Sequence, residues 1–200
     1  MQGSIGVDEA GRGPVAGPVA VGAVWVPKGF DFELLPRVDD SKKLTEKMRE
    51  RAFRAACALV EKGILRYHVA LISAEHIDAR GITDAVRTGI TACFAALDAD
   101  PATTHVKLDG LLKAPEAFVH QETIIGGDAS EPTIALASIL AKVTRDRYMV
   151  SLHETSPAYG FAAHKGYGTK QHYRAIAEHG MMHEHRRSFL KKFSEGLGTN

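Results

Sequence analysis

Two apolar segments joined by a short turn open the chain and constrain its fold more than any later feature. Residues 4–10 (SIGVDEA) and 17–27 (GPVAVGAVWVP) are rich in Val and bounded by Gly and Pro, which is typical of β-strands. The turn between them reads Gly-Arg-Gly-Pro. Patterns typical of helices follow these strands along the chain, so we expect a fold of the α/β class.

Periodicity and capping signals place the remaining elements. Thr45 suits the N-cap of a helix, Gly63 suits its end, and Pro132 suits the first turn of a long helix. The pattern predicts strands at residues 64–72, 104–110 and 118–128, helices at residues 45–62, 83–97 and 132–153, and short helical pieces after Thr169 and after His185. The apolar residues of the long helix are Ile134, Leu136, Ile139, Leu140 and Val143. Strands come first and helices later in a mixed order, which predicts one mixed central sheet.

Length and composition exclude several protein classes. Two hundred residues suit one domain, or a domain with a small appendage. Charged side chains or His interrupt every long apolar stretch, and the first residues lack the pattern of a secretory signal, so we expect neither a membrane protein nor a secreted one. The two cysteines, Cys57 and Cys93, lie in helical patterns, and we expect buried, reduced thiols in a cytoplasmic protein.

Basic residues concentrate near the C-terminus. The formal net charge is +1, but residues 164–193 hold seven Lys or Arg against two acids, while the rest of the chain holds 18 basic and 22 acidic side chains. This division indicates an anionic partner met on one face, although a solvated helical face produces the same pattern. For His183 and His185, in this segment, we expect a surface or phosphate-facing role and not a metal site.

Four carboxylates lie where predicted strands end: Asp8, Glu9, Asp109 and Asp128. Strand ends on one side of a helix-covered sheet line a common crevice, so acids distant in sequence can meet there. Four close carboxylates repel one another unless hard divalent cations neutralise them. Such a cluster can hold two ions about 3.5–4 Å apart, which suits an in-line phosphoryl displacement. For the Asp8–Glu9 pair taken alone, a strand that ends in a polar turn is the simpler interpretation.

Other metal or phosphate sites have little support in the sequence. The two cysteines form no CxxC pair and the ten histidines include no HExxH motif, which argues against zinc. The Gly-Arg-Gly turn lacks the GxxxxGK[ST] pattern of a P-loop.

Five successive segments resemble the motifs of one known family. They read GVDEAGRGPVAGPVAVGAV, DDSKKLTEKMRE, VKLDG, IIGGDASEPTIALASILAKVTRDRYM, and YGFAAHKGYGTKQHYRAIAEHG followed by HRRSF. In order and spacing they are similar to the motifs of bacterial ribonuclease HII, the type 2 ribonuclease H, and they run from residue 4 to residue 193.

The resemblance implies an RNase H-like fold, with a mixed central β-sheet flanked by helices and a small helical C-terminal segment. It divides the chain into a catalytic core, residues 1–155, and a basic loop and helical segment, residues 156–200, which completes the nucleic-acid-binding face. It implies an endonuclease that hydrolyses the RNA strand of RNA–DNA hybrids and cuts 5′ of single ribonucleotides in duplex DNA, leaving 3′-OH and 5′-phosphate ends. Such an activity would serve ribonucleotide excision repair.

The resemblance also carries over individual residues. Asp8, Glu9, Asp109 and Asp128 match the catalytic acids that bind two divalent cations, Mn²⁺ or Mg²⁺. The ribose-reading loop matches Gly11, Arg12 and Gly13, and the tyrosine that stacks on the sugar next to the ribonucleotide matches Tyr167. Glycines let the main chain approach the nucleic acid closely, and backbone groups can read the 2′-hydroxyl without regard to base sequence.

Further substrate contacts are expected from Ser41, Lys42, Lys142 and Arg186. For Ser41 and Lys42 a helix entry with a solvated lysine remains an alternative, and for Lys142 a salt bridge with Asp146 or Glu154 does. Arg186 is expected to contact phosphates through its charge, together with Arg187, Lys191 and Lys192.

The chain departs from the family pattern in three places. Ser130 replaces a basic residue, Arg80–Gly81 stands where an Asn is usual, and Met181–Met182 lacks the usual proline. These departures bear on the grip on substrate and leave the four acids intact.

Two other functions stay open. Another two-metal nuclease of the same fold would need no reader of the 2′-hydroxyl, and a hybrid-binding module without catalysis would not need all four acids. We expect a monomer whose partners are RNA–DNA hybrids and ribonucleotide-containing duplex DNA, with no membrane partner. The tail SEGLGTN shows no aromatic-ended motif for a replication clamp.

Overall fold

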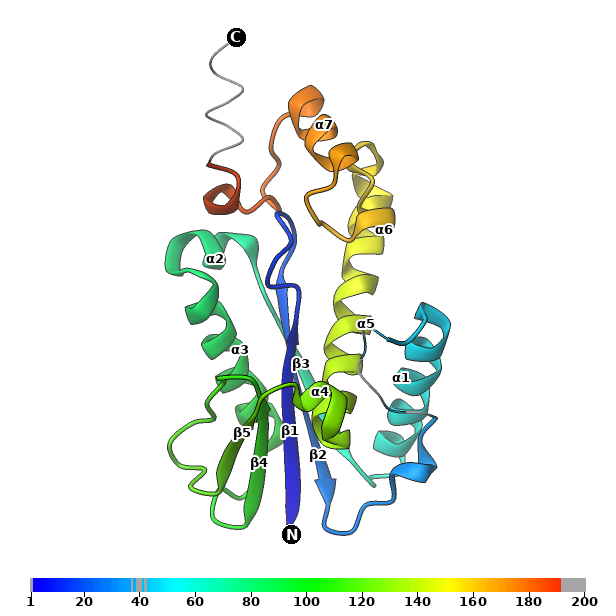
Figure 1. The fold of residues 1–200 in the computed structure, drawn as a ribbon, viewed down its shortest axis with the longest axis vertical. Coiled ribbons are helices and arrows are strands. Elements are labelled where there is room, and N and C mark those ends of the chain that lie inside the picture. Colours follow the sequence, from blue (N-terminus) through cyan, green and yellow to red (C-terminus); the bar gives the residue numbers. More distant parts are fainter. Residues whose placement is uncertain (1, 37, 39–40, 42, 192–200) are drawn as a thin grey trace.

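A five-stranded mixed sheet forms the centre of the protein in the computed structural model, which describes residues 2–36, 38, 41 and 43–191 (Figure 1). Its strands are β1 (Gly3–Ala10), β2 (Val19–Pro27), β3 (Arg66–Ile72), β4 (Thr104–Asp109) and β5 (Gln121–Ile124). The order across the sheet is β3-β2-β1-β4-β5. β1, β2 and β3 pair antiparallel, whereas β1, β4 and β5 pair parallel. The predicted mixed sheet is confirmed.

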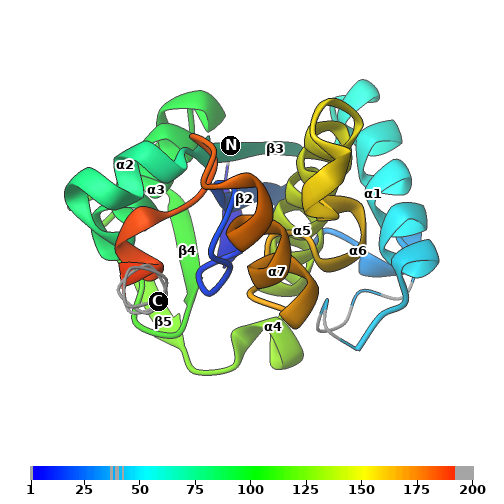
Figure 2. The same ribbon diagram turned by 90° about the horizontal axis from the view of Figure 1, so that it is seen from above.

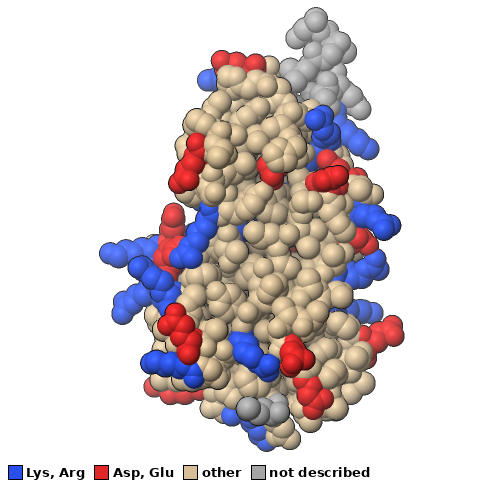
Figure 3. Space-filling view, turned by 180° about the vertical axis from the view of Figure 1, so that it is seen from behind, with Lys and Arg blue, Asp and Glu red and all other residues tan. Residues whose placement is uncertain are grey.

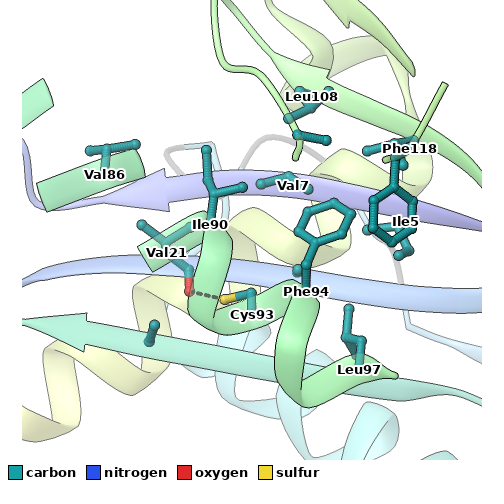
Figure 4. Close-up of a cluster of buried hydrophobic side chains, with 14 of the residues drawn as sticks. Ile5, Val7, Val21, Val86, Ile90, Cys93, Phe94, Leu97, Leu108 and Phe118 are labelled. Atoms are coloured by element: carbon teal, nitrogen blue, oxygen red, sulfur yellow. Dashed lines mark hydrogen bonds between the residues drawn. The ribbon is translucent and has the colours of Figure 1, made fainter. Parts of the chain in front are cut away.

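Helices cover both faces of this sheet, as Figures 1 and 2 show. On one face, α2 (Ala74–Arg80) and α3 (Ile82–Leu97) pack against the apolar side chains of β1, β2 and β4. Figure 4 shows this core, with Ile90 and Phe94 of α3 beside Val7 and Ile5 of β1. On the other face, α1 (Glu46–Glu61) and α5 (Pro132–Thr155) enclose a second core.

Local signals explain where the helices begin and end. The Thr45 hydroxyl accepts a hydrogen bond from the backbone N–H of Met48 at 3.3 Å, which caps α1 as predicted. Gly63 follows the end of α1 with φ of +68°, a conformation that favours glycine. Pro132 opens α5. The apolar residues predicted for this helix, Ile134, Leu136, Ile139, Leu140 and Val143, are all buried.

Both cysteines are free thiols, as expected. Cys93 is buried on α3, and its Sγ donates to the carbonyl oxygen of Val21 at 3.2 Å (Figure 4). Burial raises the pKa of the Cys93 thiol to about 11, so this thiol stays protonated. Cys57 on α1 is half-buried, less enclosed than predicted.

The predicted strand at residues 118–128 is too long. β5 ends at Ile124, because Gly126 turns the chain with φ of +67°, and the short helix α4 (Gly127–Ser130) follows. The helix α2 was not predicted; Ser73 caps it by accepting from the backbone N–H of His76 at 3.2 Å. Serine is common in loops as well as at helix N-termini, so Ser73 alone does not indicate a helix that is only seven residues long.

The C-terminal part packs over the end of β1 (Figures 1 and 2). It contains η2 (Pro157–Tyr159), α6 (Phe161–His164), α7 (Lys170–His179) and η3 (Arg187–Phe189), so the predicted helical pieces after Thr169 and His185 are confirmed. Residues 184–186 pair with residues 15–17. The Gly17 N–H donates to the Glu184 carbonyl oxygen at 2.8 Å, and the Arg186 N–H donates to the Val15 carbonyl oxygen at 2.8 Å. Residues 184–186 therefore hold the loop that follows β1 in place.

The connection between β2 and α1 contains the short helix η1 (Phe32–Leu34). Among the described residues, no helix has the length and apolarity needed to cross a membrane.

Candidate active site

The parallel pairing of β1 and β4 brings Asp8 and Asp109 to neighbouring strand ends. The register pairs Val7 with Leu108, so the next residue on each strand is one of the two acids. Val7 and Leu108 both point into the core under α3, and alternation along a strand therefore turns Asp8 and Asp109 toward the α5 side.

Close contact between β1 and α5 encloses Asp8. A Cβ on Gly6, two residues earlier on the same face, would lie 2.3 Å from the Thr133 backbone, so only glycine permits this approach. Asp8 is 5% exposed as a result. It accepts hydrogen bonds from the Glu9 N–H at 2.7 Å and from the Ser138 hydroxyl on α5.

Asp128 lies on a helix and not at a strand end. The Gly127 N–H donates to Asp109 Oδ1 at 2.8 Å, which fastens the start of α4 to β4. Asp128 is the next residue and is 7% exposed. The prediction that each acid ends a strand is thus wrong for Asp128, although Asp109 and the first turn of α4 are in contact.

The surroundings of Asp8 favour the protonated form of its carboxyl group. The pKa of Asp8 is raised to about 8, first by burial and then by the neighbouring carboxylates of Glu9 and Asp109, while the bonds from Ser138 and the Glu9 N–H oppose the rise. An all-oxygen donor set of this kind fits a hard divalent cation, which would allow these acids to ionise together. The described residues nevertheless contain no group of three His, Cys, Asp or Glu side chains already gathered to hold a metal ion.

Glu9 lies beside a pocket on the α3 side of the strand ends. Arg12 Nη1 is 3.1 Å from Glu9 Oε1 in an ion pair. The pocket has a volume of about 660 Å³ and lies between α3 and the loop after β4. Asp109 also lines it, with Arg87 and Lys113 among the basic residues. A concave site lined by both carboxylates and basic side chains in this arrangement can admit an anionic strand.

Two buried arginines hold the loop after β1. Arg186 is 0% exposed, and its guanidinium donates to the carbonyl oxygens of Gly11 at 2.7 Å, Arg12 at 2.9 Å and Gly17 at 2.9 Å. Arg145 on α5 donates to three carbonyl oxygens nearby, those of Pro18 (2.8 Å), Lys165 (2.9 Å) and Ala16 (3.1 Å). The phosphate contact expected of Arg186 is therefore corrected, because all of its guanidinium nitrogens face backbone inside the protein.

Tyr167 lies next to the same loop. Tyr167 is 46% exposed, and a Cβ built on Gly13 would lie 4.0 Å from the Tyr167 ring atom Cε1. The structure thus brings together the predicted loop, Gly11–Gly13, and the predicted stacking residue, which are more than 150 positions apart in the sequence.

A buried histidine pair supports the Tyr167 backbone, which the sequence did not suggest. His185 Nδ1 accepts from the Met182 N–H at 3.0 Å, so its proton is on Nε2, which lies 3.1 Å from His172 Nε2. His172 Nδ1 is then the protonated nitrogen and donates to the Tyr167 carbonyl oxygen at 2.9 Å. Burial lowers the pKa of both imidazoles to about 4, so both are neutral. The expected surface role of His185 is wrong.

The other predicted substrate contacts have different positions. Ser41 is buried, and its hydroxyl lies 2.8 Å from the Ser138 hydroxyl, so it stands behind Asp8 and not on the surface. Lys142 is half-buried and pairs with Asp146 at 2.7 Å, the alternative given above. Lys42 lies outside the described residues, as does Lys192.

The three departures from the family pattern lie in α4, at the junction of α2 and α3, and beside the C-terminal core. The Ser130 hydroxyl donates to the Gly126 carbonyl oxygen at 3.3 Å within α4. Gly81 has φ of +84° at the junction of α2 and α3. Met181 and Met182 pack against the C-terminal core.

The short helix α4 lies in front of α5 in Figure 1. Figure 3 shows the opposite face, where the described Lys and Arg side chains are interspersed with Asp and Glu along the margins. That face offers no one-sided basic surface among the residues drawn in colour.

Comparison with known proteins gives one family. The family model described as Ribonuclease HII matches residues 5–193. A Ribonuclease HII of Burkholderia mallei (strain SAVP1) is 47% identical over 184 residues, which cover 92% of this chain and 81% of that protein. The crystal structure of the ribonuclease H2 from Pyrococcus horikoshii OT3 superposes with a TM-score of 0.77 at 27% identity, covering 99% of this chain and 100% of that one. An RNase HII from Archaeoglobus fulgidus, solved in complex with PCNA, gives a TM-score of 0.72 at 25% identity, covering 98% and 97%.

Proposed function

The chain belongs to the ribonuclease HII family and is a type 2 ribonuclease H, and on this premise we propose that it cuts the RNA strand of RNA–DNA hybrids and duplex DNA on the 5′ side of a single embedded ribonucleotide. The observation that carries the proposal is the parallel pairing of β1 and β4, because it places the buried Asp8 and the half-buried Asp109 at adjacent strand ends beside the Gly11–Gly13 loop. The products would carry 3′-OH and 5′-phosphate ends.

The proposed ligands of two divalent cations, Mn²⁺ or Mg²⁺, are Asp8, Glu9, Asp109 and Asp128. When bound, such ions activate a water molecule and stabilise the leaving oxygen of a phosphodiester. Asp8 would contribute a buried carboxylate whose position is set by Ser138 and the Glu9 N–H. Asp109 would contribute one oxygen while Gly127 N–H holds the other. Arg12 would orient Glu9 through their ion pair.

The backbone of the Gly11–Gly13 loop and the ring of Tyr167 would select the substrate. The loop Gly11–Gly13 presents main chain with little side-chain bulk, which suits a reader of the 2′-hydroxyl. Tyr167 lies next to Gly13, so its ring can stack on the sugar that adjoins the ribonucleotide. Arg187, exposed beside the buried Arg186, is the better candidate for a phosphate contact.

The remaining assignments extend this proposal. Residues 156–200 would complete the nucleic-acid-binding face of a core formed by residues 1–155, in a cytoplasmic monomer active in ribonucleotide excision repair. The archaeal neighbour was solved with PCNA. The absence of an aromatic-ended clamp motif from the tail stays a prediction from sequence, since residues 194–200 lie outside the described part of the chain.

A substrate panel tests the proposal. The wild-type protein is mixed with Mg²⁺ and three duplexes of one sequence: all-DNA, DNA with one ribonucleotide, and a continuous RNA–DNA hybrid. We expect cleavage of the last two and none of the first. Degradation of the all-DNA duplex from its ends would identify another nuclease of this fold, and binding without product would identify a module without catalysis.

A further inference from the structure

Arg186 contacts the proposed ribose-reading loop from inside the protein. Its Nη2 and Nη1 donate to the carbonyl oxygens of Gly11 at 2.7 Å and Arg12 at 2.9 Å, and its Nε donates to Gly17 at 2.9 Å. Both loop carbonyls therefore point inward, to a guanidinium with 0% exposure.

The direction of these carbonyls fixes the direction of two N–H groups. A trans peptide unit is planar, and its N–H points opposite to its C=O. The peptide that contains the Gly11 carbonyl also contains the Arg12 N–H, and the peptide with the Arg12 carbonyl contains the Gly13 N–H. Both N–H groups must point away from Arg186, on a stretch where Arg12 and Gly13 are exposed and Tyr167 is adjacent.

A second arginine prevents the loop from turning over. Arg145, 1% exposed, binds the carbonyls of Ala16 and Pro18 at the far end of the loop. A Cβ on Gly11 would lie 2.0 Å from Arg145 Nε, and Gly11 has φ of +90°, so this position is confined to glycine. The loop is thus held between two guanidinium groups.

Only arginine can make this set of contacts. A guanidinium presents five N–H donors in a planar fork, whereas the ammonium group of a lysine is a compact point charge. Lysine at position 186 would keep the charge but could not reach carbonyls on both sides of the fork at once.

We propose that Arg186 is a positioning residue that holds the Gly11 and Arg12 peptide planes so that the N–H groups of Arg12 and Gly13 face the ribose 2′-oxygen of the substrate. This inference rests on the proposed function, since it supposes that the loop reads ribose. It separates Arg186 from its neighbour Arg187: the first would set the preference for a ribonucleotide, and the second would supply charge.

The test compares Arg186→Lys with the matched control Arg187→Lys, since both keep the net charge. Affinities are measured with Ca²⁺ as the cation for two duplexes that differ by one ribonucleotide. We expect Arg186→Lys to lose about tenfold in affinity for the ribonucleotide duplex, as for two hydrogen bonds, and little for all-DNA. Its salt dependence on all-DNA should be unchanged, and Arg187→Lys should resemble the wild type throughout.

Two results would overturn the proposal. An equal loss on both duplexes with a shallower salt dependence would assign Arg186 a phosphate contact, and an unchanged preference would remove it from substrate reading. A wild-type protein that shows no preference for the ribonucleotide duplex would instead refute the proposed function itself.

A measurement on the wild type covers the case in which Arg186→Lys does not fold. Backbone amide NMR of the protein with each duplex should show shifts at Arg12 and Gly13 that occur with the ribonucleotide duplex and are absent with all-DNA. Identical spectra for these two amides with both duplexes would contradict the inference.

Discussion

The histidine pair under Tyr167 predicts how stability depends on pH. His172 and His185 are 0% and 1% exposed, and their hydrogen bonds require both rings to be neutral. Replacing His185 with Gln keeps a donor for His172 and an acceptor for the Met182 N–H, but removes a titrating group. The substitution His185→Gln therefore isolates the effect that protonation of His185 has on the free energy of unfolding.

The sign and size follow from the pKa values. In the folded protein the pKa of His185 is lowered by burial to about 4 from an ordinary value of 6.5. The unfolded chain consequently binds a proton that the folded chain refuses, and the contribution of this residue to stability, full above pH 6.5, is lost as the pH falls toward 4. Between pH 7.5 and 4.5 one such imidazole costs about 2.5 kcal/mol.

The assay is urea unfolding of wild type and His185→Gln at several pH values between these limits. Asp8 acts in the opposite direction, because its raised pKa causes stability to be lost as the pH rises from 3.8 toward about 8, so only the difference between the two proteins is informative. We expect the wild type to lose about 2.5 kcal/mol relative to His185→Gln on acidification. His183→Gln, which removes an exposed imidazole from the same segment, is the control. A difference in unfolding free energy that does not change with pH would show that His185 does not titrate with a lowered pKa in the folded protein.

Three further predictions concern activity. Asp8→Asn keeps the size of the side chain but removes a proposed ligand charge, so cleavage should collapse while hybrid binding survives; residual activity above about a tenth of wild type would contradict the ligand assignment. Arg187→Ala should reduce the slope of log affinity against log salt by about one unit, and an unchanged slope would leave Arg187 as a solvated side chain. Tyr167→Ala should lose about 5- to 150-fold in cleavage at a single embedded ribonucleotide and less on a continuous hybrid, with Tyr167→Phe between; equal losses on both substrates would show that Tyr167 only supports its loop.

The sequence predicted those features that depend on local pattern. Val-rich strands and the capped helices α1 and α5 were found because alternation and capping are visible over a few residues. Asp8 and Asp109 were placed correctly at strand ends for the same reason, whereas the parallel pairing that makes these two strands neighbours is seen only in the structure. Asp128 was misplaced on a strand because the two glycines before it suit a strand end and a helix start equally well.

Long-range pairing explains what the sequence did not show. Arg186 and His185 belong to a basic segment, and their composition suggested a surface. They are buried because residues 184–186 pair with the loop at residues 15–17 and supply its carbonyls with donors. No local signal distinguishes Arg186 from the exposed Arg187, since the difference arises only when segments about 170 residues apart meet.

The most direct test of the proposed activity is to map the cut in a DNA duplex that contains one ribonucleotide, with and without Mn²⁺ or Mg²⁺. We expect a single cut on the 5′ side of the ribonucleotide, with 3′-OH and 5′-phosphate ends, and no product when the cation is chelated. A product formed without divalent cation, or a cut at a position unrelated to the ribonucleotide, would contradict the proposed activity.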